Sequence, residues 1–214
     1  MARERITTIT KTRKISKGSI VAISILGGLF LIVSILFAFT LQTASNYALS
    51  LENMYEKNFY DLVDNVNNTE TKLAKTLSAT DSEYQAKLLS EIAKNSYLAQ
   101  ENLNNLPYSV NGIDESIAFI NQVSGYSETL YKKLKNGGNL TATELTTLEK
   151  IYDSVLDMKG SLNDMSKDLW DGYSILNASL KIDGDYNNFT KQISAIKTND
   201  VEYPTMIYDG PFSD

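Results

Sequence analysis

The chain contains neither cysteine nor histidine among its 214 residues. It therefore has no disulfide bond, no thiol nucleophile, no histidine-based catalytic triad and none of the usual cysteine or histidine ligands of zinc. Carboxylates, hydroxyls and amines are the groups left for chemistry. No cofactor and no metal site is predicted, and without cysteine the sequence does not indicate the redox state of its compartment.

Proline is scarce, with three residues in the chain. Neither proline nor glycine occurs between Gly28 and Leu106. Because these two residues are the strongest interrupters of helices, their absence leaves this region free to form long helices, and strand signals are nearly absent from it. The predicted fold class is all-α.

Residues 20–41 carry no charge and read IVAISILGGLFLIVSILFAFTL. As a helix they would span roughly 33 Å, which matches the ~30 Å hydrocarbon core of a bilayer. This stretch is predicted to be a transmembrane helix. A buried core helix would show a polar stripe, and a cleaved signal sequence would be shorter, although the small residues Ala44 and Ser45 keep that alternative open. The predicted membrane-anchor residues are Ile20, Val21, Ile25, Leu29, Phe30, Ile35, Phe37 and Leu41.

The net charge changes sign across this stretch. It is +5 for residues 1–19 and −11 for residues 42–214. The positive-inside rule places the basic end in the cytoplasm and the acidic part across the membrane, as in a single-pass membrane protein. The acidic charge also argues against nucleic acid or anionic lipid as the main partner of the outer part.

Apolar residues after the span recur at steps of three and four, which is typical of helices that pack on other helices. The first outer helix is predicted to continue from the span through Tyr47 and Leu51 to about Ser78. Thr80 and Glu83 have the spacing of a capping box, so a second helix is predicted to begin there. Tyr84 is predicted to belong to the apolar stripe of this helix.

The third predicted helix begins after Asn111, a suitable N-cap, and ends at Gly137 and Gly138. Thr141 and Glu144 form a second capping box, which predicts the start of a fourth helix. The four amphipathic segments are joined by short connections. They are therefore predicted to form an up-down bundle outside the membrane.

The fourth helix is predicted to extend to about Leu176, with a break or bend allowed at Gly160 or Gly172. The predicted domain organisation has four parts: a basic cytoplasmic tail (1–19), a transmembrane helix (20–41), an extracytoplasmic helical bundle of about four helices (42–180), and a short helix or turn followed by an extended tail (181–214).

Paired carboxylates, as in glycosidases, are the enzymatic option that remains. The fourth helix carries five aspartates that lie beside or opposite its apolar stripe, which is the position of solvent-exposed residues. These are Asp153, Asp157, Asp164, Asp168 and Asp171. The protein is therefore predicted not to be an enzyme. The thirteen tyrosines of the chain fall mostly at helical spacing, which favours packing at the edge of a core, with a partner surface as the alternative.

The last segment, residues 201–214, reads VEYPTMIYDGPFSD and is predicted to be extended because of its two prolines. Together with the single N-terminal span and the run YEKNFYDLV at residues 55–63, it resembles the N-terminal half of the spore germination protein family YpeB. Five residues of this segment are candidates for partner binding: Tyr203, Pro204, Ile207, Tyr208 and Phe212.

The resemblance implies a protein of an endospore-forming Firmicute, held at the spore inner membrane and facing the cortex. Family members are needed for retention and function of the cortex-lytic enzyme SleB, which degrades cortex peptidoglycan at germination, and are not themselves the hydrolase. They continue past the extended segment into PepSY repeats, which this chain is expected to lack.

These observations predict a non-enzymatic, membrane-anchored scaffold for SleB. The alternative is an extracytoplasmic sensory domain that binds a small ligand, although the 19 residues before the span offer no output domain. The sequence leaves open whether the protein forms a homo-oligomer.

Overall fold

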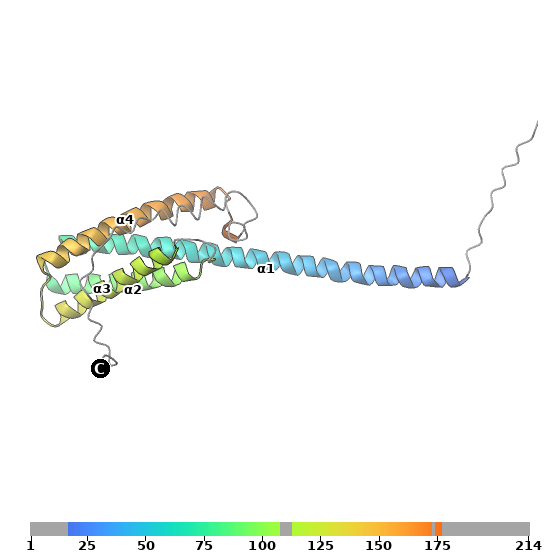
Figure 1. Cartoon of the computed structure of the whole chain (residues 1–214), viewed down its shortest axis with the longest axis horizontal. Helices are drawn as coiled ribbons and strands as arrows, with labels where there is room; N and C mark the ends of the chain where they lie inside the picture. Colours follow the sequence, from blue (N-terminus) through green and yellow to red (C-terminus); the bar gives the residue numbers. More distant parts are fainter. Residues whose placement is uncertain (1–16, 108–112, 173, 177–214) are drawn as a thin grey trace, which may run out of the picture. The chain divides into compact units, whose positions relative to one another are not determined.

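The computed structural model describes residues 17–107, 113–172 and 174–176. Four α-helices follow one another along the chain (Figure 1): α1 at Lys17–Ser78, α2 at Ser82–Asn104, α3 at Ile113–Lys135 and α4 at Ala142–Trp170. All regular secondary structure among these residues is helical. The predicted all-α fold class is confirmed, and the predicted tail of residues 181–214 lies outside the described part of the chain.

The chain divides into two compact units, residues 1–48 and residues 49–214. Helix α1, 62 residues long, contributes to both. No proline or glycine follows Gly28 in this helix, so its backbone hydrogen bonding has no residue that would interrupt it. The predicted continuation of the span into the first outer helix is therefore observed.

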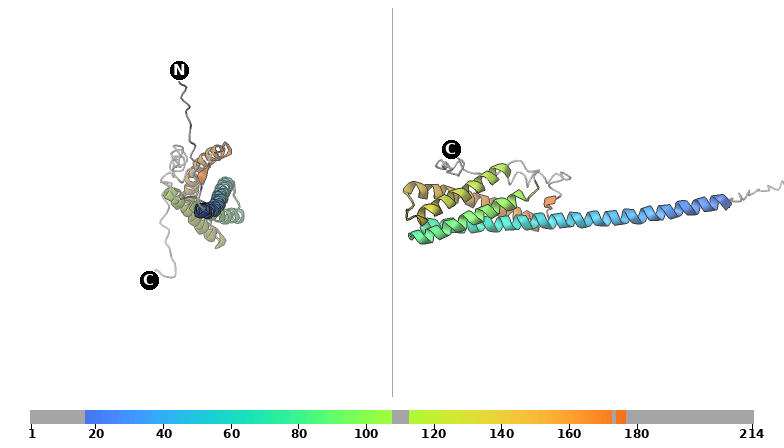
Figure 2. Two further views of the ribbon diagram at one scale, coloured as in Figure 1. Left: turned by 90° about the vertical axis from the view of Figure 1, so that its right-hand side faces the viewer. Right: turned by 90° about the horizontal axis from the view of Figure 1, so that it is seen from below.

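The second unit is a helical bundle around one hydrophobic core. Figure 2 shows α2, α3, α4 and the later part of α1 lying side by side. Short connections at residues 79–81 and 136–141 reverse the chain between neighbouring helices. The largest fully buried side chains come from all four helices, and one, Leu106, from the chain just after α2: Phe59, Leu62, Leu73, Leu89, Ile92, Leu106, Leu130, Leu148, Ile151, Met158, Leu162 and Met165.

Polar contacts show that α1 and α4 run antiparallel. Glu52, early in this part of α1, contacts the backbone of Ile175 just after α4. Glu70, more than four turns further along α1, contacts Lys159 of α4. Later residues of α1 thus meet earlier residues of α4, which is the arrangement of an up-down bundle.

Most of the predicted apolar stripes form the core, but their outermost members do not. Leu51 and Tyr84 are 39% and 45% exposed, and Tyr47 is 67% exposed. Leu51 and Tyr84 lie near the ends of the bundle, where fewer neighbouring helices cover them. The regular spacing of apolar residues therefore extends beyond the part of each helix that is buried.

The N-cap of α2 corrects the sequence prediction, because it is Asp81 and not Thr80. Asp81 has an extended backbone, and its Oδ1 accepts a hydrogen bond from the backbone N–H of Tyr84 at 2.7 Å. A carboxylate caps a helix at least as well as a threonine hydroxyl, and its charge favours the positive end of the helix dipole. Glu83 is therefore one position too early to complete a capping box. The predicted N-cap at Asn111 lies outside the described residues.

The predicted end of α3 is confirmed. The N–H of Gly137 donates to the carbonyl of Leu134, and the N–H of Gly138 donates to that of Lys133, both at 3.0 Å. These two bonds form a Schellman motif, which needs a left-handed residue, and Gly137 has φ +81°.

The fourth helix is shorter than predicted. It ends at Trp170 rather than near Leu176. Gly172 adopts φ +95°, a left-handed conformation that glycine adopts without a steric cost and that ends the helix. Gly160, in contrast, lies within the unbroken helix.

Candidate functional site

Within residues 17–107, 113–172 and 174–176, nothing covers the apolar stretch of α1. The eight predicted anchor residues, from Ile20 to Leu41, are each between 53% and 71% exposed. Among the described residues, α1 is the one helix long and apolar enough to cross a membrane. A surface of this kind is costly in water, so the helix is compatible with a single-pass anchor. Lipid contact by these particular residues stays a prediction.

The polar side chains within this stretch do not need water. The hydroxyls of Ser24, Ser34 and Thr40 each donate to the backbone carbonyl four residues earlier, at 3.0, 2.8 and 2.9 Å. In a bilayer core an unsatisfied polar group costs several kcal/mol. The hydroxyl donors are thus satisfied within α1 itself, which suits a hydrocarbon environment.

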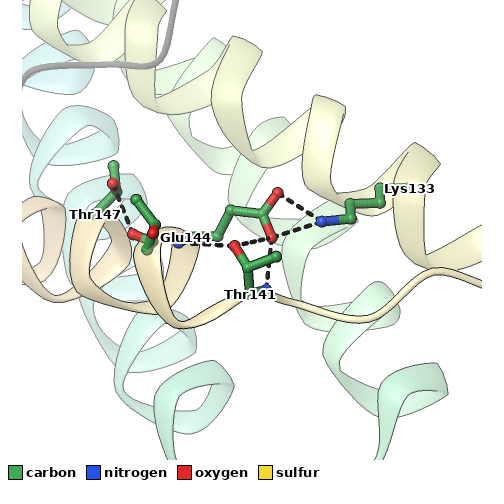
Figure 3. A network of polar contacts seen from close by, with 5 residues as sticks. Lys133, Thr141, Glu144 and Thr147 are labelled. Atoms are coloured by element: carbon green, nitrogen blue, oxygen red, sulfur yellow. Dashed lines mark hydrogen bonds and ion pairs between the residues drawn. The ribbon is translucent and has the colours of Figure 1, made fainter.

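A polar network joins the end of α3 to the start of α4 (Figure 3). The Glu144 carboxylate accepts two hydrogen bonds of 2.8 Å from Lys133 Nζ, one at each oxygen. It also accepts from the N–H of Thr141 at 2.7 Å, while the Thr141 hydroxyl accepts from the N–H of Glu144 at 3.2 Å. The capping box predicted at residues 141–144 is therefore confirmed, with an ion pair to the neighbouring helix in addition.

This network shifts the acidity of its members. Burial alone would raise the pKa of Glu144, but hydrogen bonds from Lys133 and Thr141, together with the charge of Lys133, bring the pKa below its ordinary value. Burial, and to a smaller extent the Glu144 charge, raises the pKa of Tyr126 above its ordinary value, against a hydrogen bond with Thr147. Both pKa shifts arise from contacts that hold the end of α3 against the start of α4.

Two further ion pairs connect α1 to its neighbours. Glu70 pairs with Lys159 of α4 at 3.0 Å, with side chains 12% and 30% exposed. Lys72 pairs with Glu91 of α2 at 3.7 Å. Both pairs fix neighbouring helices in register.

An open groove of about 660 Å³ lies between α2 and α3. Tyr84 and Tyr131 line it together with Lys87 and Lys135, and its other lining residues are Asp81, Glu83, Ser90 and Glu91. Aromatic rings and charges of both signs could receive a polar ligand. Among the described residues, no group of three or more aspartates or glutamates is placed to hold a metal ion.

The aspartates of α4 lie on the solvated side, as predicted. Asp153, Asp157, Asp164 and Asp171 are exposed, and Asp168 is half-buried. The five candidate partner-binding residues of the C-terminal segment, from Tyr203 to Phe212, lie outside the described residues.

Sequence reasoning missed one polar site, at Glu52. Its carboxylate accepts hydrogen bonds from the Ser174 hydroxyl at 2.9 Å and from the N–H groups of Ile175 and Leu176 at 2.8 and 2.9 Å. Glu52 thus caps the chain that follows α4. The two partners lie 122 or more residues apart, so no local motif could have predicted the contact.

Comparison with protein families assigns this bundle. The family model described as YpeB N-terminal matches residues 43–174, more than half of the chain. The chain belongs to the YpeB family. The YpeB match begins just after the apolar stretch, covers the bundle through α4, and includes no PepSY repeat. No curated protein and no solved structure matches the chain.

Membership of the YpeB family makes this a germination-related protein. The predicted family resemblance is confirmed for the helical bundle, where the match lies. The C-terminal segment, residues 201–214, falls outside the matched range.

Proposed function

We propose that this protein is a non-enzymatic, membrane-anchored scaffold that retains the cortex-lytic enzyme SleB at the outer face of the spore inner membrane. One observation carries the proposal: the YpeB N-terminal match begins directly after the apolar stretch of a helix able to cross a membrane. The net charge of +5 before that helix and −11 after it supports a bundle outside the cytoplasm.

Tethering explains how such a protein would act without chemistry of its own. A hydrolase bound to an anchored bundle is confined to a thin layer beside the membrane, which raises its effective concentration there. Helix α1 supplies both the apolar stretch and part of the bundle core, from Phe59 to Leu73. The anchor and part of the bundle core therefore belong to the same helix.

The chemistry of the chain supports a role other than catalysis. Histidine and cysteine are absent from the whole sequence, and four of the described carboxylates are engaged in structure. Glu52 and Asp81 cap backbone N–H groups, and Glu70 and Glu144 pair with lysines of neighbouring helices.

Spores that lack this gene test the proposal. They should lose or mislocalise SleB and fail to degrade their cortex on germination, and the unaltered gene should restore both. The variant Phe30→Arg should restore neither, because a charge at the centre of a membrane span costs about 2.5–3.5 kcal/mol on insertion scales. Tyr97→Arg, at a residue 60% exposed on α2, is the matched control and should restore both.

Normal SleB levels and normal cortex breakdown in the deletion strain would refute the scaffold. Full function of Phe30→Arg would refute the requirement for the anchor while leaving the scaffold in place. Immunoblotting of the spore inner-membrane fraction separates these outcomes.

The groove between α2 and α3 favours a second candidate, an extracytoplasmic ligand-binding domain. A small ligand of the groove should raise the melting temperature of the protein, and Tyr131→Ala should abolish that rise. Screening small polar metabolites by thermal shift checks this. A rise that persists in Tyr131→Ala would place the ligand elsewhere.

A further inference from the structure

The outer face of α4 exposes the only tryptophan of the chain. Trp170, the last residue of α4, is 86% exposed, the largest exposed fraction among the large hydrophobic residues that the structure describes. Leu156, on the same helix, is 43% exposed. Scattered exposed leucines are ordinary, but a tryptophan open to solvent leaves a large apolar surface in water.

These two residues share one side of the helix. They are fourteen positions apart, and at 3.6 residues per turn their directions differ by about 40°. The core residues of α4, such as Ile151, Leu162 and Leu169, lie about 80–140° away from these two residues around the helix and are buried. Gly160 lies between the two exposed residues, and a Cβ there would meet no atom within 4 Å. The surface between Leu156 and Trp170 is therefore open.

Acidic side chains lie beside and between these two residues, which are about 21 Å apart along the helix. We define the α4 outer face by the six exposed apolar or acidic residues between positions 153 and 171 that lie within an arc of about 140° on the helix. They are Asp153, Leu156, Asp157, Asp164, Trp170 and Asp171.

One lysine lies within the same arc. Lys167 pairs with Asp164 at 2.8 Å. Lys150, Lys159 and Asp168 lie within about 20° of the edges of the arc, and Lys159 is paired with Glu70 of α1. The α4 outer face is therefore negative, with four carboxylates and one ammonium. Its apolar part consists of Leu156 and Trp170.

We propose that the α4 outer face docks a protein with a basic surface and an apolar pocket that receives Trp170. Buried tryptophans are the most frequent energetic anchors of protein interfaces. A ring of carboxylates steers a partner of opposite charge and disfavours partners of like charge. The same carboxylates disfavour anionic lipid and nucleic acid, whose phosphates they would repel.

This inference rests on the proposed function, because it names the surface through which the scaffold would hold its hydrolase. The test uses the full chain in nanodiscs of neutral lipid and purified SleB. Binding of the unaltered chain is compared with that of Trp170→Ala, Asp164→Lys and the control Tyr97→Ala. Circular dichroism establishes that each variant has the helical content of the unaltered chain.

Trp170→Ala should weaken binding about tenfold or more, as expected for an interface anchor. Asp164→Lys should also weaken it, and binding of the unaltered chain should weaken as salt is raised. Tyr97→Ala should bind as the unaltered chain does. Because the chain has one tryptophan, 5-fluorotryptophan labelling gives a single ¹⁹F signal, which should shift when SleB is added.

The outcomes separate the two proposals. If the unaltered chain does not bind SleB, the proposed function fails, and the docking site fails with it. If it binds and Trp170→Ala binds equally well, the docking site is refuted and the scaffold stands. A ¹⁹F shift produced by vesicles of anionic lipid, in the absence of SleB, would assign the face to the membrane and refute a protein partner.

Discussion

Replacing Glu144 by glutamine tests the link between α3 and α4. The substitution keeps the size of the side chain and a neutral oxygen that can accept from Thr141, but it removes the charge that pairs with Lys133. The Lys133 and Glu144 side chains are 36% and 18% exposed. The pair therefore lies between a surface ion pair and a buried one.

The expected cost follows from these contacts. Exposed ion pairs contribute about 0.2–1 kcal/mol, and the two 2.8 Å bonds to Lys133 place this pair at the upper end of that range. Glu144→Gln should therefore destabilise the protein by about 1 kcal/mol at pH 7. Glu144→Ala also removes half of the capping box and should cost about 1–2.5 kcal/mol.

The effect should depend on pH. The pKa of Glu144 is lowered in the folded protein, so its carboxylate stabilises the fold fully above the unfolded pKa of about 4.3. The contribution disappears as the pH falls from about 5 through the lowered folded pKa. The difference in stability between the unaltered protein and Glu144→Gln should therefore shrink on acidification.

Urea unfolding of the full chain in non-ionic detergent, followed by circular dichroism at several pH values, measures this difference. Trp170 fluorescence is a poor probe of unfolding because the residue is already 86% exposed. Glu149→Gln, on the exposed side of the same helix, is the matched control and should change stability little. A Glu144→Gln protein as stable as the unaltered one at neutral pH, or a difference that persists unchanged at low pH, would refute the reasoning.

Three further substitutions can be followed by the same unfolding measurement. Gly160→Ala should stabilise the protein by up to about 1 kcal/mol, since alanine favours the helix and its Cβ meets nothing within 4 Å; a loss would contradict the open surface of α4. Gly137→Ala should destabilise it by about 1–2 kcal/mol because φ is +81°. Phe59→Ala should cost about 3–5 kcal/mol, as Phe59 is fully buried; a cost below 1 kcal/mol would argue against the core.

Local contacts were predictable from the sequence, and distant ones were not. The capping box at Thr141 depends on residues three positions apart, so its pattern is visible in the chain. The same logic chose Thr80 over Asp81 as the cap of α2, because two adjacent residues can both cap and the backbone decides between them. Helical periodicity predicted which residues of α1 form its apolar stripe, but not at which residue the other helices cease to cover that stripe.

Two features could not be predicted from the sequence because they depend on the three-dimensional arrangement of the helices. Glu52 meets Ser174, 122 residues later, only because α4 runs antiparallel to α1. Trp170 follows Leu169 directly, and Leu169 is 7% exposed while Trp170 is 86% exposed. Tryptophan is highly buried on average. The exposure of Trp170 depends on the direction in which it leaves α4 and on its position at the end of that helix.

The contacts of Glu52 have a mechanical consequence. A pull on the chain beyond Leu176 must break the three hydrogen bonds to Glu52 and withdraw Ile175 from the core before it can peel away the last turn of α4. Those bonds pass the load to α1, the helix that also carries the apolar stretch. A partner attached to the downstream chain would therefore load α1 directly through Glu52, as well as the bundle core through Ile175.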